Sequence, residues 1–207
     1  MFICRHVLKE FRTTVDDLHT RLWPVYRYIS AVQPPNCISI QSAKINNQPV
    51  LFANDPPAEE DVTPTVQLYM RPVGAAPITT TPMDILSCFS CVLLFLQALH
   101  EAGFCHRDIR IDNVIRCAGA YTVIDLELAA ANNQPVFWAS AALPEGVSPA
   151  GRAYVHTDDL WQLGRMILRL VGVGADERSI AIRRVAEDLV DGRVASARDA
   201  LQLVSQI

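Results

Sequence analysis

An almost unbroken apolar segment runs from Ile85 to Leu99, and it limits what this chain can fold into. Its fifteen residues are fewer than the roughly 18–20 that a helix needs to span a bilayer. Two serines and a glutamine also interrupt it. A helix this apolar has to be covered by other parts of the protein. We therefore expect a buried core helix over residues 83–102 and no membrane partner.

The elements around this helix fall into two groups along the chain. The first third alternates strand-like runs with turns, and its one helix is expected to bend or restart near Pro24, because proline lacks the N–H that a helix interior needs. After about residues 71–80 the pattern becomes helical. We expect strands at 3–11, 37–42, 49–53, 65–70, 114–115 and 121–124, and helices at 15–32, 83–102, 158–170, 177–190 and 196–205. The predicted fold class is α+β.

Composition excludes several classes of protein. The 207 residues are half apolar with a formal net charge of −4, and this balance disfavours a nucleic-acid partner, which needs a basic face. Six cysteines are present, but the sequence shows no secretory signal, so we expect free thiols and a cytoplasmic or nuclear location. Cys88 and Cys91 form a C-x-x-C within the apolar helix, where buried thiols are favoured over a zinc or redox site.

The segment with the clearest chemistry follows the apolar helix. It contains His106-Arg107-Asp108, with Asn113 five residues after the aspartate, and it resembles the catalytic loop of eukaryotic-type protein kinases. The resemblance implies that Asp108 accepts the proton of a substrate hydroxyl and that Asn113 binds Mg²⁺ through its amide oxygen. It makes Arg110 a catalytic residue that stabilises the transferred phosphoryl group. His106 would support the loop from beneath, and Arg107 would contact the activation segment.

Four further segments resemble the same family, in the family's order, within residues 83–207. Asp125, in Val-Ile-Asp-Leu-Glu, stands where the family has its metal-binding aspartate. Glu145 closes a Leu-Pro-Glu that is similar to the end of the activation segment. Asp159 stands near the start of a helix whose aspartate holds the catalytic loop by its backbone. Arg193 corresponds to the late arginine that pairs with the glutamate at position 145.

The resemblance implies a protein kinase-like two-lobed fold. Residues 1–74 would form a reduced N-lobe sheet with one helix and the hinge, and residues 75–207 a mostly helical C-lobe. ATP and Mg²⁺ are the implied cofactors. Lys9 is the amine expected to grip the nucleotide phosphates, since Lys44, the only other lysine among 18 basic residues, lies in a turn too late for that strand.

The sequence departs from the family pattern at three points. It has no glycine-rich loop, so the two strands that roof the nucleotide are missing. The helix after Lys9 lacks the family's glutamate, so this lysine needs Asp17 or an acid from elsewhere. Glu127 replaces a glycine, as in choline and aminoglycoside kinases, and is either a salt-bridged glutamate or an additional acid near the metal.

Three functions are compatible with these residues. The first is a phosphotransferase that moves the ATP γ-phosphate to a protein hydroxyl, Ser or Thr by default. The second is a non-catalytic pseudokinase that serves as a binding module, which the missing roof favours. The third is a small-molecule kinase of the choline or aminoglycoside type. Because Asp108, Asn113 and Asp125 are all present and a pure scaffold has no chemical need for them, we favour the first and expect a protein substrate.

Overall fold

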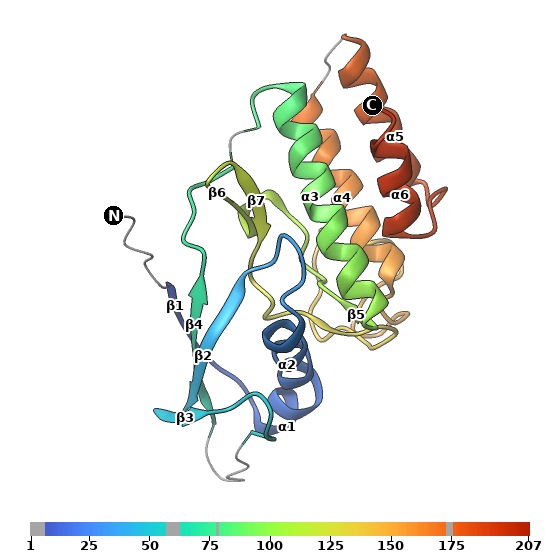
Figure 1. The fold of residues 1–207 in the computed structure, drawn as a ribbon. Helices are drawn as coiled ribbons and strands as arrows, with labels where there is room; N and C mark the ends of the chain where they lie inside the picture. The colour runs from blue at the N-terminus through green and yellow to red at the C-terminus, as the bar shows by residue number, and fades with distance from the viewer. Residues whose placement is uncertain (1–6, 57–62, 78, 173–175) are drawn as a thin grey trace.

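The computed structural model describes residues 7–56, 63–77, 79–172 and 176–207. It has an α+β architecture, with an antiparallel sheet and one helical segment in the first third and packed helices in the remainder (Figure 1). The strands of the sheet, in spatial order, are β1 (Val7–Arg12), β4 (Thr65–Arg71), β2 (Ser39–Ile45) and β3 (Gln48–Val50).

Alternating apolar residues explain the central place of β4. Val66, Leu68 and Met70 are buried on one face, and the residues between them are half-buried. The strand pairs with β1, where Lys9 lies opposite Leu68, and on its other side with β2. β1 is therefore an edge strand of the sheet within the described residues. The chain turns at Asn46-Asn47, and both residues have the positive φ that a tight hairpin needs. Lys44, expected in a turn, lies instead in β2, opposite Pro49.

One helical segment of changing pitch lies against the sheet. Its backbone runs through α1 (Val15–Asp17), a π-helical turn (Leu18–Leu22) and α2 (Trp23–Val32). The Thr14 hydroxyl caps its start by accepting a hydrogen bond from the backbone N–H of Asp17. The predicted restart near Pro24 is confirmed, since this proline stands in the first turn of α2, where a missing N–H is tolerated.

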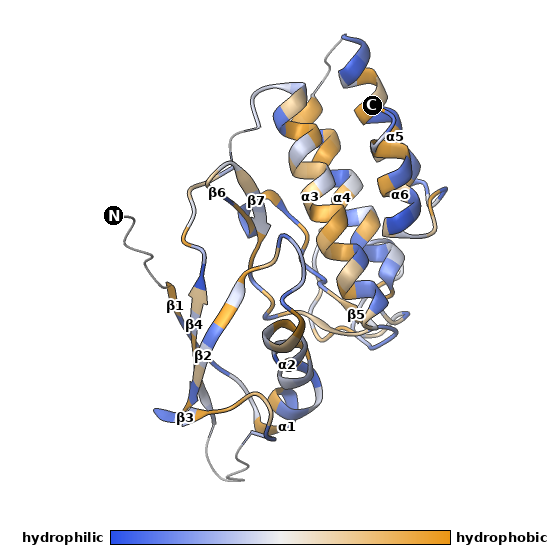
Figure 2. Ribbon diagram, viewed as in Figure 1, coloured by the Kyte–Doolittle hydropathy of each residue, from blue (hydrophilic) through white to orange (hydrophobic). Residues whose placement is uncertain are grey.

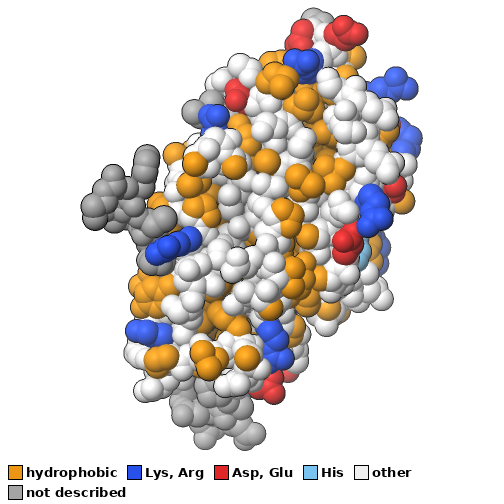
Figure 3. Space-filling model, viewed as in Figure 1, with side chains coloured by type: hydrophobic (Ala, Val, Ile, Leu, Met, Phe, Trp, Pro, Cys, Tyr) orange, Lys and Arg blue, Asp and Glu red, His pale blue; other side chains and the backbone are white. Residues whose placement is uncertain are grey.

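The predicted core helix is confirmed as the centre of a group of four. The helices are α3 (Pro82–Glu101), α4 (His156–Val171), α5 (Glu177–Val190) and α6 (Ala197–Val204). α3 contacts the other three and is mostly orange in Figure 2. Fully buried within it are Cys88, Phe89, Val92, Leu93, Phe95 and Leu96. By length and composition alone it could cross a bilayer, but its packing is that of a core helix. Met83 and Leu94 of α3 are exposed, and hydrophobic side chains are scattered over the face of the molecule shown in Figure 3.

Gly164 allows α4 and α5 to pack closely. A Cβ atom at this position would lie 2.6 Å from the carbonyl oxygen of Ala186 on α5. Any side chain would therefore push the two helices apart. This close packing fixes α4, which carries Asp159.

Short strands and backbone hydrogen bonds join the sheet to the helices. The Val123 N–H donates to the carbonyl of Asn36 at 2.7 Å, and the Ile38 N–H donates to the carbonyl of Val123 at 3.0 Å. Ala75 and Arg116 exchange two further hydrogen bonds. The short elements are β5 (Phe104–Cys105), a 3-10 turn (Ile111–Asn113), β6 (Val114–Cys117), β7 (Ala120–Val123) and β8 (Ala130–Ala131).

Several predicted bounds differ from the structure. The strand expected over 49–53 is shorter, because β3 ends at Val50. The first part of the strand expected over 3–11 lies outside the described residues. The five cysteines within the described part of the chain are free, and burial raises the pKa of the Cys88 thiol to about 12. The expectation of a buried thiol is confirmed there, while Cys4 lies outside the described residues.

Candidate active site

Asp159 of α4 holds the predicted catalytic loop by its backbone. Its fully buried carboxylate accepts hydrogen bonds from the N–H groups of His106 and Arg107, both at 2.8 Å. The Tyr154 hydroxyl and the His100 Nε2 also bond to it, each at 2.9 Å. Burial alone would raise the pKa of this carboxyl, but the hydrogen bonds, first that from His100, outweigh it and lower the pKa. The predicted contact of Asp159 is confirmed.

His106 lies beneath the loop, as predicted. Its Nδ1 accepts a hydrogen bond from the Asp108 N–H at 3.2 Å, and its Nε2 donates to the Ile124 carbonyl at 3.1 Å. This pattern requires a neutral ring with its proton on Nε2. Complete burial is the main reason that the pKa of His106 is lowered. The ring therefore joins the loop to the residue before Asp125.

One buried and one half-buried histidine predict a loss of stability in mild acid. Burial is the main cause that lowers the pKa of both His106 and His156 from 6.5. Below that pH the unfolded chain binds protons that the folded protein does not. The free energy of unfolding then falls with pH, by at most about 1.4 kcal/mol per pH unit for each ring. Urea unfolding from about pH 7.5 to 5.5 measures the slope of the free energy of unfolding against pH. His156→Gln should reduce this slope, and an unchanged slope would contradict the assigned role of His156.

Arg107 fixes the segment after β8. Its guanidinium donates to the carbonyl oxygens of Ala131, Gln134 and Pro135 at 3.0–3.3 Å and lies over the Tyr154 ring. The predicted contact of Arg107 with the segment between Asp125 and Glu145 is confirmed. Arg107 has a φ of 73°, a left-handed conformation that costs free energy in a residue other than glycine and persists only where the surrounding contacts hold it.

Gln162 also supports the loop, and the sequence analysis missed it. Its side-chain oxygen accepts a hydrogen bond from the Ile109 N–H at 2.8 Å. Its side-chain nitrogen donates to the carbonyls of Arg107 and Ala142 at 3.1 and 3.0 Å. Gln162 lies three residues after Asp159 and therefore on the same side of the helix. This spacing in the sequence could have identified it as a second residue that supports the loop.

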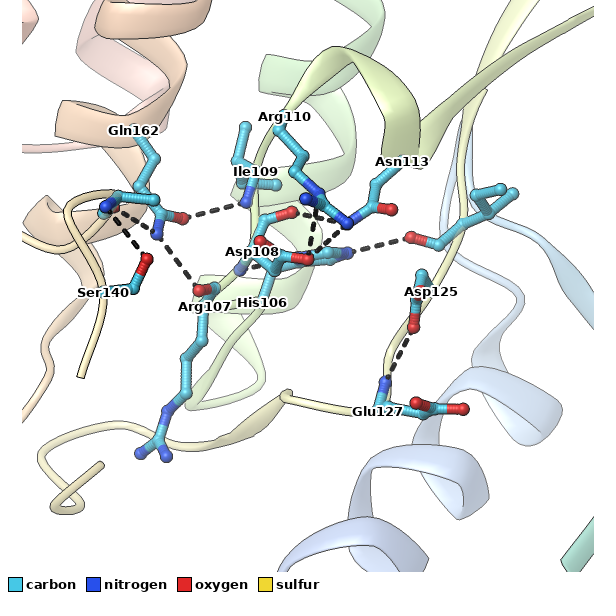
Figure 4. Close-up of polar contacts among 12 residues, drawn as sticks. His106, Arg107, Asp108, Ile109, Arg110, Asn113, Asp125, Glu127, Ser140 and Gln162 are labelled. Carbon is cyan, nitrogen blue, oxygen red and sulfur yellow. Dashed lines mark hydrogen bonds and ion pairs between the residues drawn. The ribbon is translucent and has the colours of Figure 1, made fainter. Parts of the chain in front are cut away.

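Asp108, Arg110 and Asn113 form one bonded group (Figure 4). The Asn113 side-chain nitrogen donates to the carbonyl and to the carboxylate Oδ2 of Asp108, at 2.9 and 2.7 Å. Arg110 Nε lies 3.3 Å from the same Oδ2. The Asp108 side chain is 22% exposed, so a bound molecule can reach it. The Asn113 carbonyl also accepts a hydrogen bond from the Ile124 N–H at 2.9 Å, which places this group next to Asp125.

Lys9 on β1 bridges two acids that follow β7. Its Nζ lies 2.7 Å from Asp125 Oδ1 and 2.9 Å from Glu127 Oε1. Burial alone would raise the pKa of Asp125, but the Lys9 hydrogen bond and charge lower it. Asp125 has a φ of 65°, a second strained residue at this place. The acids that pair with Lys9 are therefore Asp125 and Glu127 rather than Asp17. Glu127 is the salt-bridged glutamate of the first interpretation.

Asp17 pairs instead with Arg21, which the sequence analysis also missed. The two side chains are one helical turn apart and joined by hydrogen bonds from the guanidinium. Arg21 donates as well to the backbone carbonyls of Glu127 and Ala129 and lies over the Phe137 ring. A buried cation of the first helical segment therefore holds the backbone after β7. The i,i+4 spacing of Asp17 and Arg21 was the available signal.

An apolar pocket of about 230 Å³ lies beside Lys9 and Asp125. It is enclosed by β1, the end of β4, residues 72–74 and the residues next to β6 and β7. Apolar walls with an amine and a carboxylate at one edge suit a ligand that has a flat apolar group and a charged tail. Its other lining residues are Val7, Leu8, Ile38, Met70, Pro72, Val73, Gly74, Ile115 and Ile124.

The predicted pairing of Arg193 with Glu145 is wrong. Arg193 bonds to Asp188 and Asp191 near the end of α5, at 2.6 and 2.5 Å. Glu145 is exposed, and no ion pair within the described ranges includes it. Acids two and five residues away reach this arginine without the conformational entropy cost of ordering a distant loop. The two residues therefore share no structural role.

Oxygen atoms suited to a divalent cation are present at Asn113 and Asp125. Across the described residues, no group of three or more His, Cys, Asp or Glu side chains is placed to hold a metal ion. Mg²⁺ commonly binds through one or two protein oxygens together with substrate phosphates. Lys9 bonds to Oδ1 of Asp125, which leaves Oδ2, and Asn113 donates through its nitrogen, which leaves its amide oxygen. These two residues fit Mg²⁺ chemically.

No protein-family model and no curated protein matches this chain. The function therefore has to be inferred from geometry. The site combines a reachable carboxylate bonded to an amide and a guanidinium, an amine between two acids, and an apolar pocket at their side. Such a set can bind a charged ligand and accept a proton from a hydroxyl.

Proposed function

We propose that this protein is a protein kinase-like phosphotransferase that moves the γ-phosphate of ATP to a protein hydroxyl. The main support is that Lys9 meets Asp125, 116 residues away, at one edge of the apolar pocket, and that the Asn113 carbonyl joins the loop at 106–113 to the residue before Asp125. In this proposal residues 1–74 form the smaller lobe and residues 75–207 the larger lobe of a kinase-like fold. The nucleotide lies between them, with its base in the apolar pocket.

Asp108 and Arg110 would act at the acceptor side. The acceptor hydroxyl gives its proton to the Asp108 carboxylate as its oxygen bonds to phosphorus and the bond from phosphorus to ADP breaks. Asn113 holds that carboxylate through a 2.7 Å hydrogen bond. The Arg110 side chain, 57% exposed and only 3.3 Å from Asp108, can turn to the charge on the transferred group.

Lys9 and Glu127 would act at the nucleotide side. Two carboxylates surround the one amine, so this part of the site carries a formal excess of one negative charge. Mg²⁺ bound by Asn113 and Asp125 would neutralise phosphate charge that the site alone repels. Lys9 could then exchange its contact with Asp125 for the phosphates, while Glu127 keeps the amine in place.

Loss of the Asp125 carboxylate is expected to abolish Mg²⁺-dependent ATP binding. Ligand at one hundred times its Kd adds about 2.7 kcal/mol to the stability of the folded protein. For a chain of this size that corresponds to a rise in Tm of roughly 5–11 °C. Thermal unfolding of wild type with millimolar Mg-ATP should show such a rise, scaled by the actual Kd, and Asp125→Ala should show little or none.

Asp112→Ala is the matched control, because this exposed carboxylate belongs to the same loop and has no hydrogen bond or ion pair in the described structure. Its Tm should rise with Mg-ATP as in wild type. If wild type shows no shift, the phosphotransferase proposal fails and a non-catalytic binding module takes its place. A shift in Asp125→Ala equal to that of wild type would remove Asp125 from the nucleotide site.

A further inference from the structure

A second pocket, of about 250 Å³, adjoins the catalytic loop on its acceptor side. Its walls are residues 109–112, which directly follow Asp108, residues 141–142 and the exposed face of α4. Three arginines line it, Arg110, Arg165 and Arg169. We call it the basic pocket.

The positive charge of the basic pocket is only partly neutralised by the protein. Arg165 and Arg169 are exposed, and neither has a carboxylate partner in the described part of the chain. Asp112 is the one acid among the described lining residues. Arg110 pairs with Asp108 at 3.3 Å, so two guanidinium groups, those of Arg165 and Arg169, remain against one carboxylate, in a protein whose net charge is −4. A local excess of positive charge on an acidic protein points to an anionic ligand.

The basic pocket is held rigidly against the catalytic loop. Gln162 lies in its wall and bonds to the Ile109 N–H, to the Arg107 carbonyl and to the Ala142 carbonyl, at 2.8–3.1 Å. These bonds join all three walls. A ligand group bound in this pocket is consequently at a fixed place relative to Asp108, as a specificity site requires.

The spacing of the arginines matches an extended peptide. Trp161, Arg165 and Arg169 follow one another at four-residue intervals, so their positions are separated by about 6 Å along the helix. Alternate side chains of an extended chain are separated by about 6.6 Å. Arg165 lies 5.2 Å from the Trp161 ring centre, and this stacking orients its guanidinium. Two successive same-side carboxylates of a peptide could each meet one planar guanidinium.

We propose that the basic pocket selects acceptor polypeptides with acidic residues beside the phosphorylated hydroxyl. Arg165 and Arg169 bind the carboxylates and Arg110 connects the pocket to Asp108. The apolar part of the wall, with Trp161, covers the aliphatic portions of the peptide. This inference rests on the proposed function, because it assigns the acceptor of the same site.

The test is peptide binding measured without catalysis. A fluorescent twelve-residue peptide with one serine flanked by glutamates, and its counterpart with glutamines, are titrated with protein by anisotropy at low salt. Wild type and Asp125→Ala should both bind the glutamate peptide. Neither protein should bind the glutamine peptide. The double variant Arg165→Ala/Arg169→Ala should bind it at least ten-fold more weakly.

Arg178→Ala/Arg184→Ala on α5 is the matched control, since it removes the same charge from exposed helix positions outside the pocket. An equal loss of binding in this variant, or binding of the glutamine peptide, would overturn the proposal. Far-UV circular dichroism shows whether both double variants remain folded. We expect that they do, because alanine has a high helix propensity. If wild type binds the peptide but its Tm does not rise with Mg-ATP, only the phosphotransferase proposal is refuted. If its Tm rises with Mg-ATP but it does not bind the peptide, only the acceptor assignment is refuted.

Discussion

Replacing Asp108 with asparagine is expected to reduce phosphoryl transfer by about 100- to 10,000-fold, the range for loss of a general base. Asparagine has the same shape and can still accept the hydrogen bond that Asn113 donates at 2.7 Å. It cannot take a proton from the acceptor hydroxyl. The loop should keep its position, because Asp159 holds the backbone of the two residues before Asp108.

The measurement is transfer of radiolabel from γ-labelled ATP to protein or peptide, with choline and an aminoglycoside as parallel acceptors. Asp191→Asn, an exposed acid near the end of α5 that lines neither pocket, is the control and should transfer at the wild-type rate. Asp108→Asn should keep the full rise in Tm with Mg-ATP, since Asp108 is not among the residues that line the nucleotide pocket. Equal transfer by wild type and Asp108→Asn would contradict the role of Asp108. Transfer to the small molecules alone would favour a small-molecule kinase.

The helices were predictable because their ends are determined by nearby residues. α3 begins where the Thr81 hydroxyl and the Asp84 carboxylate cap each other's backbone. α5 has the predicted bounds, and the Asp176 side chain caps its first turn. The two-residue strands β5 and β8 could not be predicted, since a pair this short is held by its tertiary surroundings rather than by any local pattern.

The site was predictable only in part, because its contacts are of two kinds. The contacts of Asp108 lie within the loop, and their spacing in the sequence indicated them. The partners of Lys9 come from more than a hundred residues away, and no local spacing identifies Glu127 as one of them. Arg193 shows the converse error, since a distant partner was expected and two local acids bind it instead.

The stability of the whole site should depend most on Asp159. Four donors meet its buried carboxylate, at 2.8–2.9 Å. Asp159→Asn replaces one oxygen with an NH₂ group that cannot accept, so it leaves buried donors unpaired and removes the charge that they stabilise. Breaking a buried charged network typically costs about 3–5 kcal/mol, which for a chain of this length lowers Tm by roughly 6–20 °C. Thermal and urea unfolding measure the loss.

Asp191→Asn is the matched control, because its carboxylate also binds an arginine but is 53% exposed. Exposed pairs contribute at most about 1 kcal/mol, so its Tm should change little. Tyr154→Phe removes one donor and should cost about 1 kcal/mol, which keeps the test valid if Asp159→Asn does not fold.

The lowered pKa of Asp159 means that its contribution to stability is present above pH 3.8 and is lost as pH falls through the lower folded-state value. The difference in the free energy of unfolding between wild type and Asp159→Asn should therefore stay constant from neutral pH to about 5 and shrink only in stronger acid. Equal free energies of unfolding at neutral pH would show that other contacts hold the loop.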